Sequence, residues 1–338
     1  MTLPPGKIPV DLLKQIVFKN LGARRNEVAL GPSAGIDGAV INLGNKSLIV
    51  SMDPITGALE RIGWLSVNVN ANDIATFGVE PQFMLSCMML PENADKKTVE
   101  AISVQMGQAS KKLGIAIVGG HCETTPGLTN PIVVGCVMGF TRKGNYVTAA
   151  GAQPQDTLIL TKTAGIEGTA ILANDREKQP QKAIKLSTLT KAKTYFKRIS
   201  VVKDATEAFK TRGVHAMHDP TEGGIIGGVS EIAEASQLGV EIHENKIPVT
   251  PETALICKHF KIDPLRLISS GALLIAADKT AAQRIIDRLK KEQIQASIIG
   301  NFLKNPKNRT LIRKDGKSED LPRFVSDHLW IALSEASA

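Results

Sequence analysis

The chain has 338 residues, of which 43% are hydrophobic and 22% charged, and a formal net charge of +8. This composition is typical of a folded globular protein and argues against intrinsic disorder. A chain of this length usually divides into two domains, and no apolar run approaches the ~20 residues that a membrane-spanning helix needs.

The sequence carries none of the common targeting or zinc-binding signals. Its first residues contain no apolar segment of a secretory signal, so the cytoplasm is the expected location. The cysteines form no CxxC pair, and we expect free thiols, most of them buried. Nine basic residues between positions 178 and 210 have helical spacing. They favour a solvated helix face over nucleic-acid binding, because few aromatic side chains are interleaved with them.

Hydrophobic periodicity predicts the elements of the first half in chain order. Helices are expected at residues 10–21, 59–77 and 96–113. Strands are expected at residues 39–42, 47–52, 82–90, 115–118 and 131–140. A glycine-rich loop at 31–38 precedes the first strand, and the strand at 115–118 is expected to end in the loop Gly119-Gly120-His121.

A cluster of glycine, alanine and proline near residues 142–154 predicts a boundary, with domains at 1–148 and 149–338. Beyond it, strands are expected at 157–161, 240–243, 272–276, 297–299 and 310–312. Helices are expected at 166–173, 187–199, 203–211 and 223–236. The alternation of helices with hairpin-like strand pairs predicts a mixed α/β (α+β) fold and not a simple Rossmann sheet.

Aspartates at the ends of apolar elements are the first candidate site. Neither a P-loop nor a dinucleotide-binding glycine motif is present. Asp37 follows the glycine-rich loop, Asp53 follows an apolar strand, and Asp73 interrupts an otherwise apolar helix beside Asn72. Each alone is more often a cap or a turn residue. Together they can hold a divalent cation, because Mg²⁺ prefers carboxylate, water and phosphate oxygens.

Two glycine-rich segments are further candidates. Gly119-Gly120-His121-Cys122 follows an apolar strand, where glycines let a ligand approach the backbone. Here His121 is either a proton carrier or a hydrogen-bonded loop residue, and Cys122 is more readily interpreted as a buried filler than as a nucleophile. The segment Asp219-Pro220-Thr221-Glu222-Gly223-Gly224 opens a helix, whose N-terminus can bind phosphate. The alternative is that Asp219 or Thr221 only caps that helix.

Five segments, in this order and spacing, resemble the aminoimidazole ribonucleotide synthetase (PurM-like) superfamily, and its HypE branch in particular. They are Asp37-Gly38-Ala39-Val40-Ile41, Ser51-Met52-Asp53, Asn72-Asp73-Ile74-Ala75, Gly119-Gly120-His121-Cys122-Glu123 and Asp219-Pro220-Thr221-Glu222-Gly223-Gly224. The resemblance covers nearly the whole chain. It implies a two-domain PurM-like fold whose N-terminal sheet pairs with a second subunit into a β-barrel, giving a homodimer.

The resemblance also implies roles for individual residues. ATP and Mg²⁺ are the implied cofactors, with Asp37, Asp53 and Asp73 as metal ligands. Asp73 and His121 are the implied catalytic residues. The nucleotide would be bound by Asn72, Gly119, Gly120, Asp219, Thr221, Gly223 and Gly224.

The chain departs from the HypE pattern at its C-terminus, where Leu333-Ser334-Glu335-Ala336-Ser337-Ala338 contains no cysteine to carry a carbamoyl group. Glu222 also stands where Arg is common, and Ile36 where an acid is frequent. The leading hypothesis is phosphoryl transfer from Mg·ATP to the oxygen of a small-molecule or protein-borne carboxamide. A small-molecule kinase resembling thiamine-monophosphate kinase is one alternative. A non-catalytic ATP-binding partner of a metallocentre maturation factor is the other. Neither nucleic acid nor a membrane is an expected partner.

Overall fold

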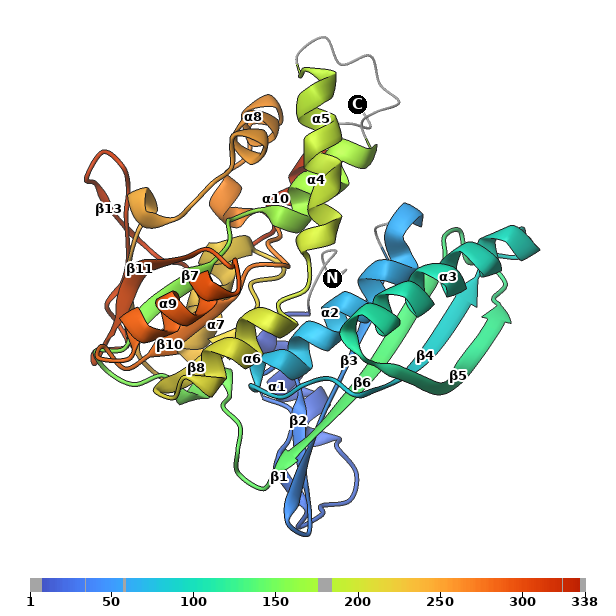
Figure 1. The fold of residues 1–338 in the computed structure, drawn as a ribbon, viewed down its shortest axis with the longest axis horizontal. Helices are drawn as coiled ribbons and strands as arrows, with labels where there is room; N and C mark the ends of the chain where they lie inside the picture. The colour runs from blue at the N-terminus through green and yellow to red at the C-terminus, as the bar shows by residue number, and fades with distance from the viewer. Residues whose placement is uncertain (1–7, 34, 57–58, 176–183, 324, 335–338) are drawn as a thin grey trace.

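The computed structural model describes residues 8–33, 35–56, 59–175, 184–323 and 325–334. Two β-sheets, each with helices packed on it, lie side by side and are joined along helix α2 (Figure 1). The mixed α/β fold expected from the sequence is therefore confirmed. Among the described helices, none combines the length and the apolar character needed to cross a bilayer.

The first sheet has six strands in the order β1-β2-β3-β6-β4-β5. Their bounds are β1 Val28–Leu30, β2 Ala39–Leu43, β3 Lys46–Ile55, β4 Phe83–Leu90, β5 Ala116–Thr124 and β6 Ile132–Arg142. All neighbours are antiparallel except β4 and β5, which are parallel. The hairpin between β2 and β3 turns through Gly44 and Asn45, and Gly44 supplies the positive φ of 61°.

The second sheet has seven strands in the order β13-β12-β9-β11-β7-β10-β8. Their bounds are β7 Thr157–Thr161, β8 Val214–His218, β9 Gly239–His243, β10 Leu274–Ala277, β11 Ala296–Leu303, β12 Arg309–Ile312 and β13 Ser318–Asp320. Only β12 and β9 pair in parallel. The side chains of β7 alternate between two cores: Leu158 and Leu160 face one, and Ile159 faces the other.

Helices cover one face of the first sheet and both faces of the second (Figure 1). The helix bounds are α1 Val10–Gln15, α2 Ile62–Thr76, α3 Lys96–Leu113, α4 Ile166–Asp175, α5 Leu186–Lys193, α6 Val202–Lys210, α7 Gly224–Ala235, α8 Pro251–His259, α9 Ala282–Lys291 and α10 His328–Ser334. Short 3-10 turns, η1 to η6, lie at Val17–Lys19, Leu59–Arg61, Ala149–Gly151, Thr194–Arg198, Glu244–Lys246 and Pro264–Arg266.

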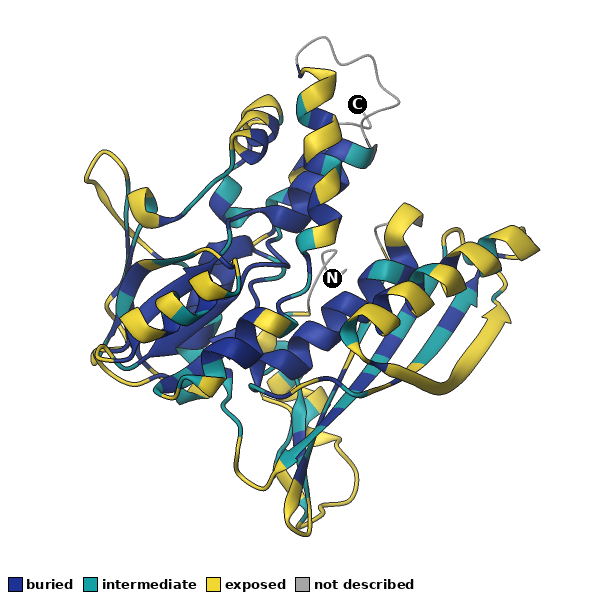
Figure 2. Cartoon of the chain, in the orientation of Figure 1, coloured by how far each residue is buried: buried dark blue, intermediate teal, exposed yellow. Residues whose placement is uncertain are grey.

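Helix α2 belongs to both halves of the molecule, and all its residues except Trp64 are buried (Figure 2). One side packs on β3 and β6, and another contacts α6 of the second half. Leu65 and Val69 join the core of the second half, whereas Val67 and Ile74 join the core under the first sheet. A helix buried on all sides explains why its sequence is apolar all round and why its few polar residues must find partners.

Several expectations are corrected by the structure. The helix expected at 10–21 is α1 followed by η1, and the helix expected at 187–199 is α5 followed by η4. Asp53 lies inside β3, which continues through Pro54 to Ile55. Of the four cysteines, all free, only Cys257 is buried, and Cys122 is exposed, so the expectation of mostly buried thiols is wrong.

The domain boundary expected at 148/149 stays a prediction. All strands of the first sheet end by Arg142, and those of the second begin at Thr157. The first sheet of one chain is open, with β1 and β5 as its edges. The barrel formed with a second subunit therefore also stays a prediction.

Candidate functional site

Asp73 lies where the two halves of the molecule meet and is 3% exposed on α2. The hydroxyl of Ser51, from β3, lies 2.8 Å from a carboxylate oxygen of Asp73 and also contacts the carbonyl oxygen of Asp37. Ser51 therefore joins the strand, the helix and the loop before β2 at one point. The alternation of side chains along β3 places Ser51 and Asp53 on the same face, toward α2.

Four carboxylates converge at this point. Burial raises the pKa of Asp73 well above its usual value, and the nearby charges of Asp53, Asp219 and Asp37 raise it further. The hydrogen bond from Ser51 opposes the shift. The contacts agree with this: Asp53 shares one face of β3 with Ser51, which bonds Asp73, and ligand atoms of Asp37 and Asp219 lie within 4.8 Å of each other. Asp37, Asp53 and Asp73 come from the first half of the chain, and Asp219 comes from the second half, directly after β8.

Asp37 is held by a histidine of the other half. The Nδ1 atom of His218 lies 2.6 Å from a carboxylate oxygen of Asp37, and its Nε2 atom lies 2.6 Å from one of Glu231, on α7. Burial lowers the pKa of His218, but the two carboxylates outweigh burial and raise the pKa well above the usual value. A protonated His218 donates both ring protons, one to each acid.

The donor set fits a hard divalent cation. One ligand atom each from Asp37, His218 and Asp219 lie within 4.8 Å of one another. Both nitrogens of His218 are already bonded to carboxylates, which leaves carboxylate oxygens as the ligands. Mg²⁺ takes such oxygens, and a bound cation offsets the repulsion that raises the pKa of Asp73. Asp37, Asp53, Asp73 and Asp219 are the residues that would hold it.

Asp53 is positioned through its backbone. Its N–H donates to the side-chain oxygen of Asn70 at 2.7 Å, and the amide nitrogen of Asn70 donates back to the carbonyl oxygen of Asp53 at 3.2 Å. Asn70 lies on α2, one turn before Asp73, and is fully buried. This pair of bonds keeps β3 and α2 in register beside the acids.

Asn72 connects α2 to the second half of the chain. Its amide nitrogen donates to the carbonyl oxygen of Ile199 at 2.9 Å, and its side-chain oxygen accepts from the N–H of Val201 at 2.8 Å. Asn72 is fully buried. Its side-chain amide therefore links α2 to the second half through two hydrogen bonds. A direct contact between Asn72 and phosphate remains a prediction.

The loop before α7 contains the other predicted residues of the second half. Gly223 and Gly224 have φ values of 80° and 62°, which favour glycine. A side chain at Gly224 would also meet the carbonyl oxygens of Leu265 and Leu267. The N–H of Gly223 donates to Asp327 at 2.7 Å, so it is used within the chain. Thr221, two residues after Asp219, lies in the same loop and is half-buried.

The expected loop Gly119-Gly120-His121 is part of the edge strand β5, whose residues are all exposed (Figure 2). A side chain at Gly120 would collide with the backbone of Ser86, so glycine lets β5 pair with β4. His121 pairs with Cys87 and bonds Glu123 at 3.1 Å. The expectation of a loop is wrong because the strand continues, and Cys122, expected as a buried filler, is exposed.

His121 and the carboxylates are not brought together in one chain. The strand pairing across β5, β4, β6 and β3 aligns His121 with Pro54, the residue after Asp53. Alternation directs it to the sheet face opposite Asp53, and three strand spacings separate it from β3, roughly 14 Å. A role for His121 at these acids would therefore require a second copy of the chain.

Ser51, His218 and Glu231 are site residues to which the sequence had assigned no role. Ser51 and His218 each lie within two residues of a predicted acid in the sequence. This proximity could have indicated that they belong to the site. Glu231 is separated from Asp219 by twelve positions, and only the direction of α7 brings it to His218.

This fold and site define a two-domain α/β protein with a carboxylate site at the junction of its halves. The chain belongs to the AIR synthase related protein family. Residues 35–141 match the N-terminal domain of that family, and residues 153–312 match its C-terminal domain.

Two relatives that match most of the chain carry names from hydrogenase maturation. A Methanocaldococcus jannaschii protein, named for hydrogenase expression and formation, is 28% identical over 311 residues, covering 89% of this chain and 90% of the relative. The carbamoyl dehydratase HypE of Escherichia coli is 27% identical over 260 residues, covering 75% and 73%.

Solved structures share the fold. The HypE–HypF complex contains a chain with a TM-score of 0.76 at 20% identity, covering 93% of this chain and 99% of that chain. HypE in complex with ATP has a TM-score of 0.69 at 21% identity, covering 94% and 92%. Thiamine monophosphate kinase from Aquifex aeolicus has a TM-score of 0.66 at 18% identity, covering 91% and 97%.

Proposed function

We propose that this chain is an ATP- and Mg²⁺-dependent enzyme that phosphorylates a carboxamide oxygen and thereby drives dehydration, as a carbamoyl dehydratase does. The observation that carries the proposal is the convergence of Asp37, Asp53, Asp73 and Asp219 from both halves of the chain. The names of the HypE relatives and the ATP complex of a similar fold support it.

In the proposed reaction, the carboxamide oxygen attacks the γ-phosphorus of ATP, and the bond from that phosphorus to the bridging oxygen breaks. ADP takes the bonding electrons and leaves. The phosphorylated oxygen then departs as phosphate while the nitrogen loses its protons, which leaves a nitrile. Phosphorylation is needed because oxide or hydroxide is a poor leaving group from carbon.

The bound Mg²⁺ would neutralise the phosphate charge and align the transferred group. The surrounding side chains of the protein hold the carboxylates in fixed positions. Ser51 and His218 hold Asp73 and Asp37, and Asn70 holds the backbone of Asp53. Because these side chains are oriented before substrate binds, little reorganisation is needed during the reaction.

The homodimer is part of the proposal. β5 exposes all nine of its residues at a sheet edge, and such edges usually pair or are covered. The exposed side chains of Met52 on β3 and of Phe83 and Leu85 on β4 lie on the same sheet, on the face away from α2. A second copy seated there would bury this face and could carry His121 toward the acids of its partner.

The acceptor and partner follow from the same relatives. A HypE–HypF complex supports a maturation-factor protein as partner. The name carbamoyl dehydratase of a relative supports a carboxamide as substrate, and we propose that it is protein-borne. The cytoplasmic location stays a prediction. A small-molecule kinase is the alternative that the fold also accommodates, since a thiamine monophosphate kinase shares it.

Calorimetric titration of ATP, with and without Mg²⁺, tests the nucleotide site in the wild type, in Asp73→Asn and in Asp287→Asn. Asp287 is an exposed acid on α9 and serves as the control. We expect Mg²⁺-dependent binding that only Asp73→Asn abolishes. A folded wild type that binds no Mg·ATP would disprove the proposal.

Phosphorus NMR of reactions with a peptide that carries an S-carbamoyl cysteine tests the chemistry. Release of free phosphate, together with conversion of the S-carbamoyl cysteine of the peptide into a thiocyanate, supports the dehydratase. With a panel of small-molecule alcohols and phosphate monoesters, accumulation of a stable phosphorylated product would instead identify a kinase.

A further inference from the structure

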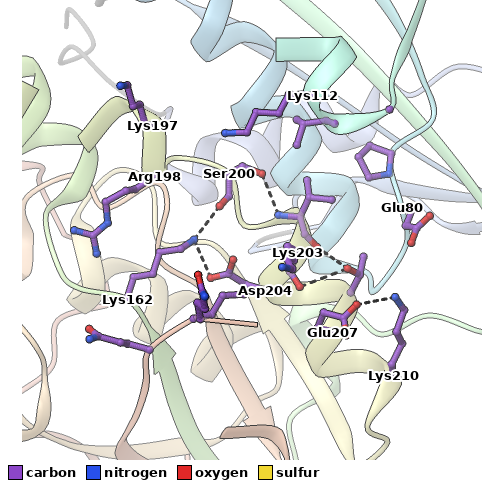
Figure 3. Close-up of a pocket in the computed structure, with 18 of the residues that line it drawn as sticks. Glu80, Lys112, Lys162, Lys197, Arg198, Ser200, Lys203, Asp204, Glu207 and Lys210 are labelled. Atoms are coloured by element: carbon purple, nitrogen blue, oxygen red, sulfur yellow. Dashed lines mark hydrogen bonds and ion pairs between the residues drawn. The ribbon is translucent and has the colours of Figure 1, made fainter. Parts of the chain in front are cut away.

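A basic pocket of about 940 Å³ lies between the two halves of the molecule, apart from the carboxylates (Figure 3). On one side it is lined by the loop between α2 and β4 and by the end of α3. On the other it is lined by η4, by α6 along its whole length and by the turn before β11. Asp37, Asp53, Asp73 and Asp219 are not among its lining residues. Its size falls within the ~300–1,000 Å³ range of small-molecule sites.

Six basic side chains line this pocket and only three acidic ones do. Some of the basic groups are already paired. Lys162 uses its three donors on Asp204 and on the carbonyl oxygens of Ser200 and Gly271, each at 2.8 Å. Lys210 pairs with Glu207 at 2.8 Å.

Four basic groups remain, and three of them carry the surplus charge. Lys203 pairs with Glu292 outside the pocket at 2.8 Å. Within the described part of the chain, Lys112, Lys197 and Arg198 have no carboxylate partner, and Glu80 is the one acid left on the wall. The pocket therefore keeps a net positive charge.

Two of these cations are held in place by aromatic rings. The ammonium of Lys112 lies 5.5 Å from the ring centre of Trp64, and the guanidinium of Arg198 lies 5.0 Å from that of Tyr195. The indole N–H of Trp64 donates to the carbonyl oxygen of Phe196 at 3.0 Å. The α2 side and the η4 side of the pocket are thereby joined. Figure 3 shows Lys112 reaching from the α3 side toward the side that carries Lys197.

We propose that this pocket binds a small molecule that bears two or more phosphate groups and so bridges the two halves of the protein. Lysine and arginine form charge-assisted hydrogen bonds to phosphate oxygens, and cations from opposite walls suit a ligand with separated negative groups. The concave shape and limited volume favour a small molecule over a nucleic acid or an acidic protein segment.

Unlike the carboxylate site, the basic pocket needs no metal ion to bind phosphate. Four acids repel phosphate unless a divalent cation is bound, whereas Lys112, Lys197 and Arg198 attract phosphate directly. Phosphate binding in the presence of EDTA therefore belongs to the basic pocket. The two sites are connected through Asn72, which is adjacent to Asp73 in the sequence. Its side chain is hydrogen-bonded to the backbone of Ile199 and Val201, the residues on either side of Ser200 in the pocket wall.

The test is titration of sodium pyrophosphate in EDTA, followed by calorimetry and by Trp64 fluorescence. Trp330→Phe provides the background, because Trp330 on α10 is the other tryptophan and is exposed. We expect saturable binding that changes the fluorescence of Trp64. Lys112→Gln and Lys197→Gln should each weaken binding about tenfold, as loss of one charge-assisted contact implies.

Both variants change exposed side chains, and Lys97→Gln is the matched control, since Lys97 is exposed at the opposite end of α3. Lys97→Gln and Asp73→Asn should bind pyrophosphate as the wild type does. The proposal is overturned if the folded wild type shows neither heat nor a fluorescence change. It is also overturned if neither pocket variant alters the affinity, or if Asp73→Asn abolishes binding in EDTA.

Discussion

The Nδ1 atom of His218 lies 2.6 Å from a carboxylate oxygen of Asp37, although 181 positions separate the two residues. The other ring nitrogen lies 2.6 Å from Glu231. The imidazole is 1% exposed, so both contacts are shielded from water. This histidine therefore fixes a predicted metal ligand of the first half to the second half of the chain.

His218→Gln should reduce stability and metal affinity together. The substitution leaves two acids without their cation, and breaking a buried pair of this kind costs about 3 kcal/mol. Loss of the partner that orients a ligand should weaken Mg²⁺ binding about tenfold or more. Urea unfolding and a Mg²⁺ titration measure the two effects. His259→Gln, which changes an exposed histidine at the end of α8, is the control. Equal unfolding midpoints for the two variants would refute the role of His218.

Asp73→Asn should stabilise the protein when no divalent cation is bound. Burial and the three neighbouring acids raise the pKa of Asp73, which means that its charged form is disfavoured in the fold. An uncharged amide removes that repulsion, and we expect the thermal midpoint in EDTA at pH 8 to rise by about 3 °C. Excess Mg²⁺ should stabilise the wild type only. A lower midpoint for Asp73→Asn in EDTA would contradict this account.

Glu167 should make stability depend on pH. Burial raises the pKa of Glu167 to about 7 from 4.5. The nearby hydroxyl of Ser270 opposes this rise in pKa, and the charges of Asp327 and Glu222 add to it. Between these two pH values the folded protein holds a proton that the unfolded chain has lost. Stability therefore falls as pH rises from about 4.5 to 7, by about 3 kcal/mol in total.

The check for Glu167 is urea unfolding at several pH values. Glu167→Gln keeps the side-chain size and has no ionisable group, so it should remove most of the fall in stability across this window. Glu60→Gln, an exposed acid, should keep the slope of the wild type. A Glu167→Gln variant with an unchanged slope would show that another group is responsible.

Asn72→Ala should loosen the contact between the two halves. The substitution leaves the carbonyl oxygen of Ile199 and the N–H of Val201 without their bonds in a buried position. Two unsatisfied groups cost about 2–4 kcal/mol. Chemical denaturation measures the loss, with the exposed turn residue Asn93→Ala as the control. Equal stability of the two variants would mean that water replaces both bonds.

The sequence alone was sufficient for elements whose ends have local signals. Helix α3 spans the predicted residues Lys96–Leu113 because Asp95 caps its start by accepting from the N–H of Thr98, and Gly114 ends it with a φ of 72°. The sequence also singled out Asp37, Asp53 and Asp73 as candidate metal ligands, and Asp219 as a candidate nucleotide-binding residue in the segment that opens α7. These signals depend on neighbours within a few positions, so they can be seen without a fold.

Only the tertiary structure decided what those polar residues face. Asn72 and Asp73 are adjacent in sequence, yet helical geometry turns Asn72 toward Val201 and Asp73 toward Ser51. His121 looked like a loop residue, and pairing with β4 made it part of an edge strand. The partner of Asp37 is His218, which no local pattern could reveal, because contacts across 181 positions depend on how the two sheets pack.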